Sequence, residues 1–259
     1  MSCDPTTLAA ASNCLNCLNP DELDSIYTNL LCGIPWGPQV INGLVAWWKA
    51  DSLSLADGTT VTLWPDSSGN SHDAGQQTGQ TAPTFLNNQV NGLPALNFTG
   101  ARLVLNPPAG GAAPGSVDLT DDHTVLAVYK QDAGNDGVII GNQSVNRQYR
   151  INNGGTRQDS FFNGVHQSLS DAFTTGQTAV TLSVWRRSGT TIFFRENKTD
   201  RNSDPVAGGT MSLNIIRDGS FGQPYAGLIF ELLIYAKSLS DTELNGLYDH
   251  YLKRRWLLP

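Results

Sequence analysis

The feature that most constrains this fold is a series of short β signals that recurs from residue 44 to residue 236 with no helix signal between them. The segments are 44–50, 60–64, 94–98, 124–130, 138–142, 147–152, 179–187, 190–196, 212–217 and 226–236. Each is rich in β-branched, aromatic or aliphatic residues. Parallel strands need long crossovers, usually helices, so the pattern excludes a βαβ architecture and favours two packed antiparallel sheets.

Composition supports many short elements and excludes two classes of partner. The 259 residues include 26 Gly and 13 Pro, as expected for strands joined by turns. The net charge is −7, and the only basic cluster, 253–255, is too short for a phosphate backbone, so we expect no nucleic-acid partner. No apolar run approaches the about 20 residues of a membrane span, and no signal-peptide pattern opens the sequence, so we expect neither a membrane span nor Sec export.

One strand signal predicts two different sheet faces. Along 180–186, Val180, Leu182 and Val184 alternate with Thr181, Ser183 and Trp185. Because successive strand residues point to opposite faces, we assign the aliphatic set to the core. The face that carries Trp185 is then a candidate groove.

The sequence after the last strand signal predicts a helix from about Asp241 to Arg255. Ser240 stands at the cap position and Glu243 follows three residues later, which is the pattern of a capping box. An apolar stripe at helical spacing predicts that the helix packs on the sandwich. The stripe consists of Leu244, Leu247, Tyr248, Tyr251 and Leu252.

The first forty residues differ in kind and predict a separate helical arm. Asn19 is a candidate cap, Pro20 occupies the first helical position, and Gly33 and Pro35 end the helix. Its apolar face consists of Leu23, Ile26, Tyr27, Leu30 and Leu31. A helix of about three turns is marginal in water by itself. We therefore divide the chain into an assembly arm with its linker, 1–40, and a main domain, 41–259, and expect a homo-oligomer.

All four cysteines lie in this arm, so the main domain has no disulfide scaffold. They are Cys3, Cys14, Cys17 and Cys32. Structural zinc sites usually contain two close cysteine pairs, whereas this pattern has only one, so zinc is the weakest of three alternatives. The others are a disulfide between Cys32 and Cys14 or Cys17, and buried thiols at an assembly interface.

Three blocks of the main domain carry a family resemblance. The run 44–51, the run 63–70 and the C-terminal strand and helix resemble the laminin-G-like branch of the concanavalin A-like lectin/glucanase superfamily, over about residues 43–259. The resemblance implies an all-β fold, a two-sheet antiparallel jelly-roll sandwich. The superfamily contains lectins, glycosidases, lyases and structural domains, so the fold does not imply the function.

The residues argue against hydrolysis. Hydrolases of this superfamily place carboxylates in a Glu-x-Asp-x-x-Glu run on one strand, and this chain has none. Its glutamates are Glu22, Glu196, Glu231 and Glu243. Glu231 lies between Phe230 and Leu232, so we interpret it as a hydrogen-bonded structural carboxylate and expect no enzyme.

The loop 66–73 has oxygen-bearing side chains at alternate positions and is a candidate calcium site. The candidate ligands are Asp66, Ser68, Asn70 and Asp73. Calcium loops of the EF-hand type need a Gly at the sixth position and a Glu at the twelfth, where this chain has Ser71 and Gln77. The favoured alternative is an Asx turn in which Asp66 accepts from backbone amides ahead of Gly69, with no cofactor.

A glycan site needs exposed aromatic faces flanked by polar side chains. The candidates are Arg150, Asn152, Arg157, Trp185 and Arg187, with 153–157 as a rim. Trp47, Trp48 and Trp64 are instead interpreted as core or sheet-packing residues.

The N-terminal pattern Cys14–Leu15–Asn16–Cys17–Leu18 with its short helix resembles the lead segments of tailed-bacteriophage proteins. This resemblance implies a structural or decoration protein of a virion, assembled in the host cytoplasm. The arm would contact other virion proteins, and the jelly roll would bind a cell-surface glycan for host attachment. The alternatives are a soluble bacterial carbohydrate-binding module and, below it, a glycoside hydrolase or lyase.

Overall fold

The computed structural model describes residues 37–107, 115–120, 122–132, 137–152, 157–162, 165–168, 179–218 and 225–259. By its contacts the chain divides into two units, Met1–Ile41 and Asn42–Pro259. The described part of the first unit is a single 3-10 turn, Pro38–Val40, with its flanking residues. The second unit contains every strand of the described residues.

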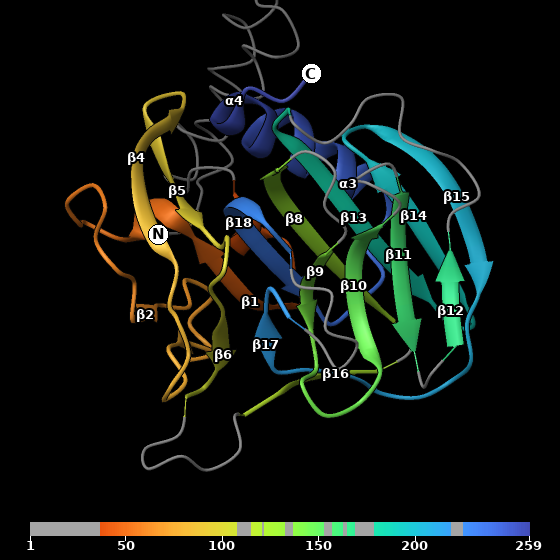
Figure 1. Ribbon diagram of the computed structural model, residues 1–259. Coiled ribbons are helices and arrows are strands. Elements are labelled where there is room, and N and C mark those ends of the chain that lie inside the picture. Colours follow the sequence, from red (N-terminus) through yellow and green to blue (C-terminus); the bar gives the residue numbers. More distant parts are fainter. Residues whose placement is uncertain are drawn as a thin grey trace, which may run out of the picture. The chain divides into compact units, whose positions relative to one another are not determined.

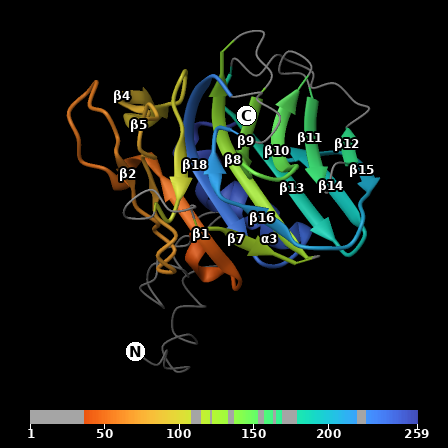
Figure 2. The ribbon, with the colours of Figure 1, turned by 60° about the horizontal axis from the view of Figure 1, so that its bottom comes forward.

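The second unit contains two antiparallel eight-stranded sheets (Figure 1). A two-stranded ribbon of β7 (Val117–Leu119) and β16 (Met211–Leu213) accompanies them (Figure 2). Sheet A has the order β15-β14-β13-β8-β18-β5-β4, with β1 also paired to β18. Its strands are β1 (Leu44–Lys49), β4 (Thr84–Val90), β5 (Leu93–Asn97), β8 (His123–Gln131), β13 (Thr181–Ser188), β14 (Thr191–Glu196), β15 (Thr199–Pro205) and β18 (Gly227–Tyr235).

Sheet B has the order β12-β11-β10-β9-β17-β6-β3-β2. Its strands are β2 (Leu63–Trp64), β3 (Ala74–Gly75), β6 (Leu103–Leu105), β9 (Gly137–Gly141), β10 (Arg147–Asn152), β11 (Arg157–Phe162), β12 (Val165–Ser168) and β17 (Ile215–Ile216). The two sheets lie in separate layers in Figure 2. The predicted two-sheet antiparallel sandwich is therefore confirmed.

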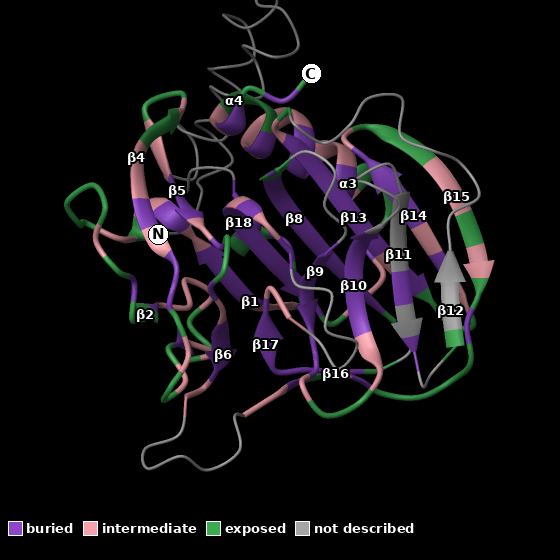
Figure 3. Ribbon diagram, in the orientation of Figure 1, coloured by how far each residue is buried: buried purple, intermediate pink, exposed green. Residues whose placement is uncertain are grey.

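The sandwich core lies between the two sheets and is aromatic as well as aliphatic. Trp48, Trp64 and Trp185 are fully buried in it, together with Tyr129 and Tyr149. Burying an aromatic side chain removes about 150–250 Å² of surface from water, so these rings dominate the packing energy. In Figure 3 the central strands β8 and β18 are mostly purple, whereas the edge strand β15 is green and pink.

Two strand predictions needed correction. The segment 60–64 contributes only β2 and an isolated bridge between Thr60 and Thr84. The segment 212–217 is split between β16 and β17, which belong to different sheets. Asn214 lies between them, and its backbone N–H and its side-chain Oδ1 bond to the end of β9 and to Gln143. This anchored residue interrupts what reads in sequence as one strand.

The C-terminal helix is confirmed, with an internal change of pitch. It runs as α3 (Asp241–Gly246), a π-helical segment (Leu247–Leu252) and α4 (Lys253–Trp256). Both halves of the capping box between Ser240 and Glu243 are present. We call these three pieces together the terminal helix. It lies on the side of sheet A that faces away from sheet B (Figures 1 and 2).

Candidate ligand-binding face

A two-sheet sandwich offers two outer sheet faces, and the terminal helix covers that of sheet A. Arg186 on β13 donates from Nη1 to the carbonyl of Leu239, at 3.0 Å, and to Asp241. Lys198, in the turn after β14, pairs with Asp249, and the Phe230 ring on β18 packs at a tilt against Trp256, with ring centroids 5.2 Å apart. The terminal helix does not lie on the outer face of sheet B, although the described residues Val104, Val138 and Ile215 on that face are also fully buried.

Glu231 anchors the terminal helix to sheet A. It is fully buried on β18, beside a register irregularity between Ile229 and Glu231. Its Oε1 accepts from Trp47 Nε1 at 2.6 Å and from the Tyr251 hydroxyl at 2.9 Å, and its Oε2 accepts from Trp256 Nε1 at 2.6 Å. Both carboxylate oxygens are thus bonded, and the interpretation of Glu231 as a structural carboxylate is confirmed.

Charge around Glu231 is also compensated. Arg255 lies 3.4 Å from the Glu231 carboxylate through Nε and forms an ion pair with Asp51. Burial raises the pKa of Glu231, and Arg255 and the three hydrogen bonds oppose that rise. The arrangement joins β1, β18 and the terminal helix at one buried point. It presents no carboxylate to a substrate.

The prediction that Trp185 faces a groove is wrong. Trp185 is fully buried in the sandwich core, where its ring packs against Tyr149 at a centroid distance of 5.5 Å. Leu182 and Val184 are also buried, but on the face that carries Arg186 toward the terminal helix. Because both faces of sheet A are covered, alternation alone could not tell which one belongs to the core.

The predicted exposure of Arg187 is also wrong. Its side chain is buried, with Nε donating to the carbonyl of Gly189, Nη1 to that of Gly209 and Nη2 to that of Ala207, at 2.9–3.1 Å. The guanidinium also lies over the ring of Phe162, 4.7 Å from the centroid. Arg187 therefore holds the 207–209 loop and does not face a ligand.

The outer face of sheet B has an apolar floor. Val104, Val138 and Ile215 are buried but lie outside the sandwich core. Gly141 lies among them, paired with Ile215 on one side and Gln148 on the other. A Cβ on Gly141 would lie 2.9 Å from the carbonyl oxygen of Asp218, so this position needs a glycine for the close approach of another backbone. We call this surface, with Gln148 and Arg150, the ligand face.

β10 supplies the polar groups of the ligand face. Tyr149 and Ile151 point into the core, so Gln148 and Arg150 point to the opposite face, where both are buried. Neither Nε2 nor Oε1 of Gln148 has a hydrogen-bond partner. A buried amide without a partner costs about 1–3 kcal/mol, so this group is an unusual feature in a native protein.

Of the five predicted glycan-binding residues, three lie on the hairpin of sheet B. Arg150 pairs in register with Asp159, and Asn152 pairs with Arg157. Paired positions of antiparallel strands share a face, so the register places 150, 152 and 157 on one side of the sheet. The side chains of Asn152 and Arg157 lie outside the described residues.

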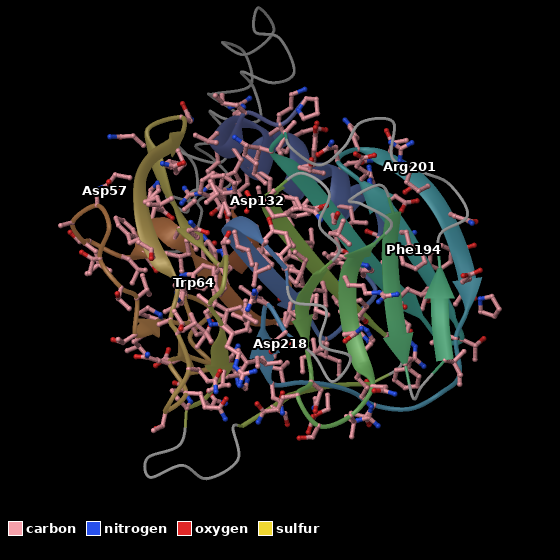
Figure 4. All side chains as sticks on the ribbon, viewed as in Figure 1. Asp57, Trp64, Asp132, Phe194, Arg201 and Asp218 are labelled. Carbon is pink, nitrogen blue, oxygen red and sulfur yellow. The ribbon has the colours of Figure 1, made fainter. Side chains whose placement is uncertain are left out.

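Sequence reasoning missed a pair of arginines at the border of the ligand face, Arg102 and Arg217, which we call the arginine pair. Arg102 precedes β6, and its Nη1 donates to Asp218 Oδ2 at 2.7 Å. Arg217 follows β17, and its Nε donates to the carbonyl of Tyr225 at 2.6 Å. Figure 4 labels Asp218 beside β17. The register of β6 and β17 brings the two arginines together. No local sequence pattern predicts this pairing.

The loop 66–73 forms an Asx turn, as the favoured alternative predicted. Asp66 Oδ1 accepts from the backbone N–H of Ser68 at 2.8 Å and of Trp47 at 2.9 Å, and Oδ2 accepts from the N–H of His72 at 3.0 Å. Asp73 accepts from the N–H of Asp66, and the Asn70 amide donates to the carbonyl of Val45. These bonds stitch the loop to β1. Calcium binding there stays a prediction.

The remaining predicted sites fall outside the described residues. They comprise the cysteine cluster (Cys3, Cys14, Cys17 and Cys32) and the apolar face of the arm helix (Leu23, Ile26, Tyr27, Leu30 and Leu31). Within the described ranges, no three His, Cys, Asp or Glu residues gather as a metal site. No helix in those ranges has the length and apolar character of a membrane span.

Two solved structures are similar to this chain in fold. Domain 4 of AbnA, an extracellular GH43 arabinanase from Geobacillus stearothermophilus in complex with arabinotriose, matches with a TM-score of 0.57 at 16% identity, covering 80% of this chain and 98% of that one. The binding domain of botulinum neurotoxin DC, in complex with SialylT, matches with a TM-score of 0.52 at 11% identity. That match covers 80% of this chain and 51% of the neurotoxin chain, about half its length.

At these identities the likeness concerns the fold, and the chain is a β-sandwich jelly-roll protein. No protein-family model matches the sequence, and no curated protein sequence matches it.

Proposed function

We propose that this protein is a non-enzymatic glycan-binding jelly-roll domain and that its sugar site is the ligand face of sheet B. The observation that carries the proposal is the unpartnered, buried amide of Gln148 beside an apolar floor and Arg150. Sugar sites combine apolar surface with a few fixed polar groups that bond hydroxyls. The sugar complexes named for two proteins of the same fold add support.

The non-enzymatic part of the proposal rests on the glutamates. Glu231 is saturated by its hydrogen bonds, Glu196 pairs with Arg201, and Glu243 belongs to the capping box. Glu22 lies outside the described residues. Hydrolysis needs two carboxylates that face each other across the glycosidic bond, and each described glutamate has a structural partner instead.

A glycan array followed by calorimetry tests the proposal. The full chain should bind at least one oligosaccharide, and Arg150→Ala should weaken that binding by about tenfold or more, the effect of about 1.4 kcal/mol. Arg254→Ala is the matched control, because Arg254 is an exposed arginine on the terminal helix. The proposal fails if no glycan binds, or if both variants bind like the parent chain.

The virion role of residues 1–40 stays a prediction. It is compatible with the proposed function: the arm would attach the protein to the virion, and the jelly roll would bind the receptor glycan. Light scattering after size-exclusion chromatography tests the arm. The full chain should be oligomeric and a chain starting at Ile41 monomeric. Two monomers would favour the soluble carbohydrate-binding module instead.

A further inference from the structure

Positive charge is concentrated at one border of the ligand face, although the chain carries a net charge of −7. Arg102 and Arg217 share one described carboxylate, that of Asp218. Burial lowers the pKa of Arg217, Asp218 opposes this, and the neighbouring Arg102 lowers it further. Asp218 compensates one of the two positive charges, and the remaining charge favours a bound anion.

The arginine pair has unused hydrogen-bonding capacity. Among the described residues, Arg217 donates only from Nε, to a carbonyl, which leaves the two amino groups of its planar fork unbonded. Arg102 bonds Asp218 and, at 3.4 Å, Gln77, while its Nε is buried without a partner. A guanidinium fork matches a carboxylate with two parallel hydrogen bonds, which Lys cannot reproduce.

A second, independent feature lies next to the arginine pair, the unpartnered amide of Gln148. The place that a Cβ on Gly141 would occupy is 2.9 Å from the Asp218 carbonyl oxygen and 3.0 Å from Gln148 Cβ. Gln148 is therefore a neighbour of the residue that binds Arg102. Its fully buried amide has neither a donor nor an acceptor. A charged subsite and an unsatisfied amide thus lie side by side on one face.

We propose that the arginine pair binds the carboxylate of an acidic sugar while Gln148 bonds a hydroxyl or amide of the same residue. This inference rests on the proposed function and names its ligand class, glycans that contain a uronic or sialic acid. Two parallel hydrogen bonds from an arginine to the sugar carboxylate would make the site prefer acidic sugars over neutral ones.

Matched pairs of acidic and neutral glycans test the inference on the full chain by calorimetry. The probes are an oligogalacturonate against its carboxyl-reduced form, and sialyllactose against lactose. We expect one acidic probe to bind about tenfold or more tightly than its neutral partner. Arg217→Ala should abolish this preference, and Arg217→Lys should lose most of it, since Lys keeps the charge but not the fork.

Controls separate this inference from the proposed function. Arg254→Ala should keep the acidic preference, and the thermal unfolding of each variant shows whether it is folded. If Arg217 variants do not fold, Arg102→Gln tests the same subsite from the other arginine. Equal binding of acidic and neutral probes, or a preference for sulfated glycans alone, overturns the inference and leaves the proposed function standing. Absence of binding to every glycan overturns both.

Discussion

The outer face of each sheet contains a fully buried polar side chain, and the two side chains differ in whether they are hydrogen-bonded. Glu231 under the terminal helix and Gln148 on the ligand face are both fully buried. Glu231 has partners for both oxygens, whereas neither amide atom of Gln148 has one. A satisfied buried group belongs to the structure of the fold. For the unsatisfied amide of Gln148, we infer a partner outside the chain, the bound glycan.

The largest effect on stability is expected when the hydrogen-bonded carboxylate of Glu231 is removed. Glu231→Ala leaves the indole donors of Trp47 and Trp256 without their acceptor and removes one of the two carboxylates that face Arg255. Removing one partner of a buried ion pair costs about 3–5 kcal/mol, so we expect a loss of that size in the free energy of unfolding, measured with urea. Asp249→Ala removes an exposed helix-to-sheet ion pair and should cost about 0–1 kcal/mol. Equal losses would contradict the anchoring role of Glu231.

The next effect has the opposite sign. Gln148→Met removes the unpartnered amide at similar volume, so the free energy of unfolding should rise by about 1 kcal/mol while glycan affinity falls. Gln89→Met on the exposed part of β4 should leave both quantities unchanged. A loss of stability in Gln148→Met would mean that the amide has an internal partner, and the contrast between the two faces would disappear.

A third prediction concerns the start of the terminal helix. Ser240 Oγ accepts from the backbone N–H of Glu243 at 3.2 Å, and Glu243 in turn accepts from the N–H of Ser240 at 2.8 Å. Ser240→Ala should lower the free energy of unfolding by about 1 kcal/mol. Glycan affinity should stay as in the parent chain, because the helix lies on the other sheet. Loss of affinity in this variant would show that the two faces are coupled.

The smallest effect is a pH dependence. Burial raises the pKa of Glu231 above its unfolded value, so the folded state holds more protons between the two values. The free energy of unfolding should therefore fall as pH rises through this interval. Glu243 contributes with the opposite sign: burial raises its pKa, but the hydrogen bonds and charge of Lys237 and the hydrogen bonds of Ser240 together outweigh burial and lower the pKa. Subtracting the urea profile of Glu231→Gln from that of the parent chain isolates the Glu231 component, and a flat difference would refute the assignment.

Much of the fold could be predicted because local patterns carry it. Turn residues bound the strands, and the Ser240–Glu243 box marks the start of the terminal helix. Trp185 was placed on the wrong face because alternation identifies two faces but not what covers each. The prediction assumed one solvated face, whereas the terminal helix covers the outer face of sheet A.

The ligand face was harder to predict for a different reason. Arg150 was predicted as a glycan-site candidate, and the register of β10 with β11 places it on the outer side of sheet B. Arg102 and Asp218 are 116 positions apart and meet only through the pairing of β6 with β17. Gln148 carries no sequence signal at all, since its significance lies in the absence of a partner in the folded chain.

The late position of the terminal helix in the chain also orders the events of folding during synthesis. Until residues 241–256 leave the ribosome, the outer face of sheet A would present Leu126, Val128 and Leu233 to water, and Glu231 would lack the donors that the helix supplies. Such transiently exposed apolar surface is prone to aggregate. The terminal helix follows every strand of sheet A in the sequence, so it acts as a shield that covers this apolar surface once it docks.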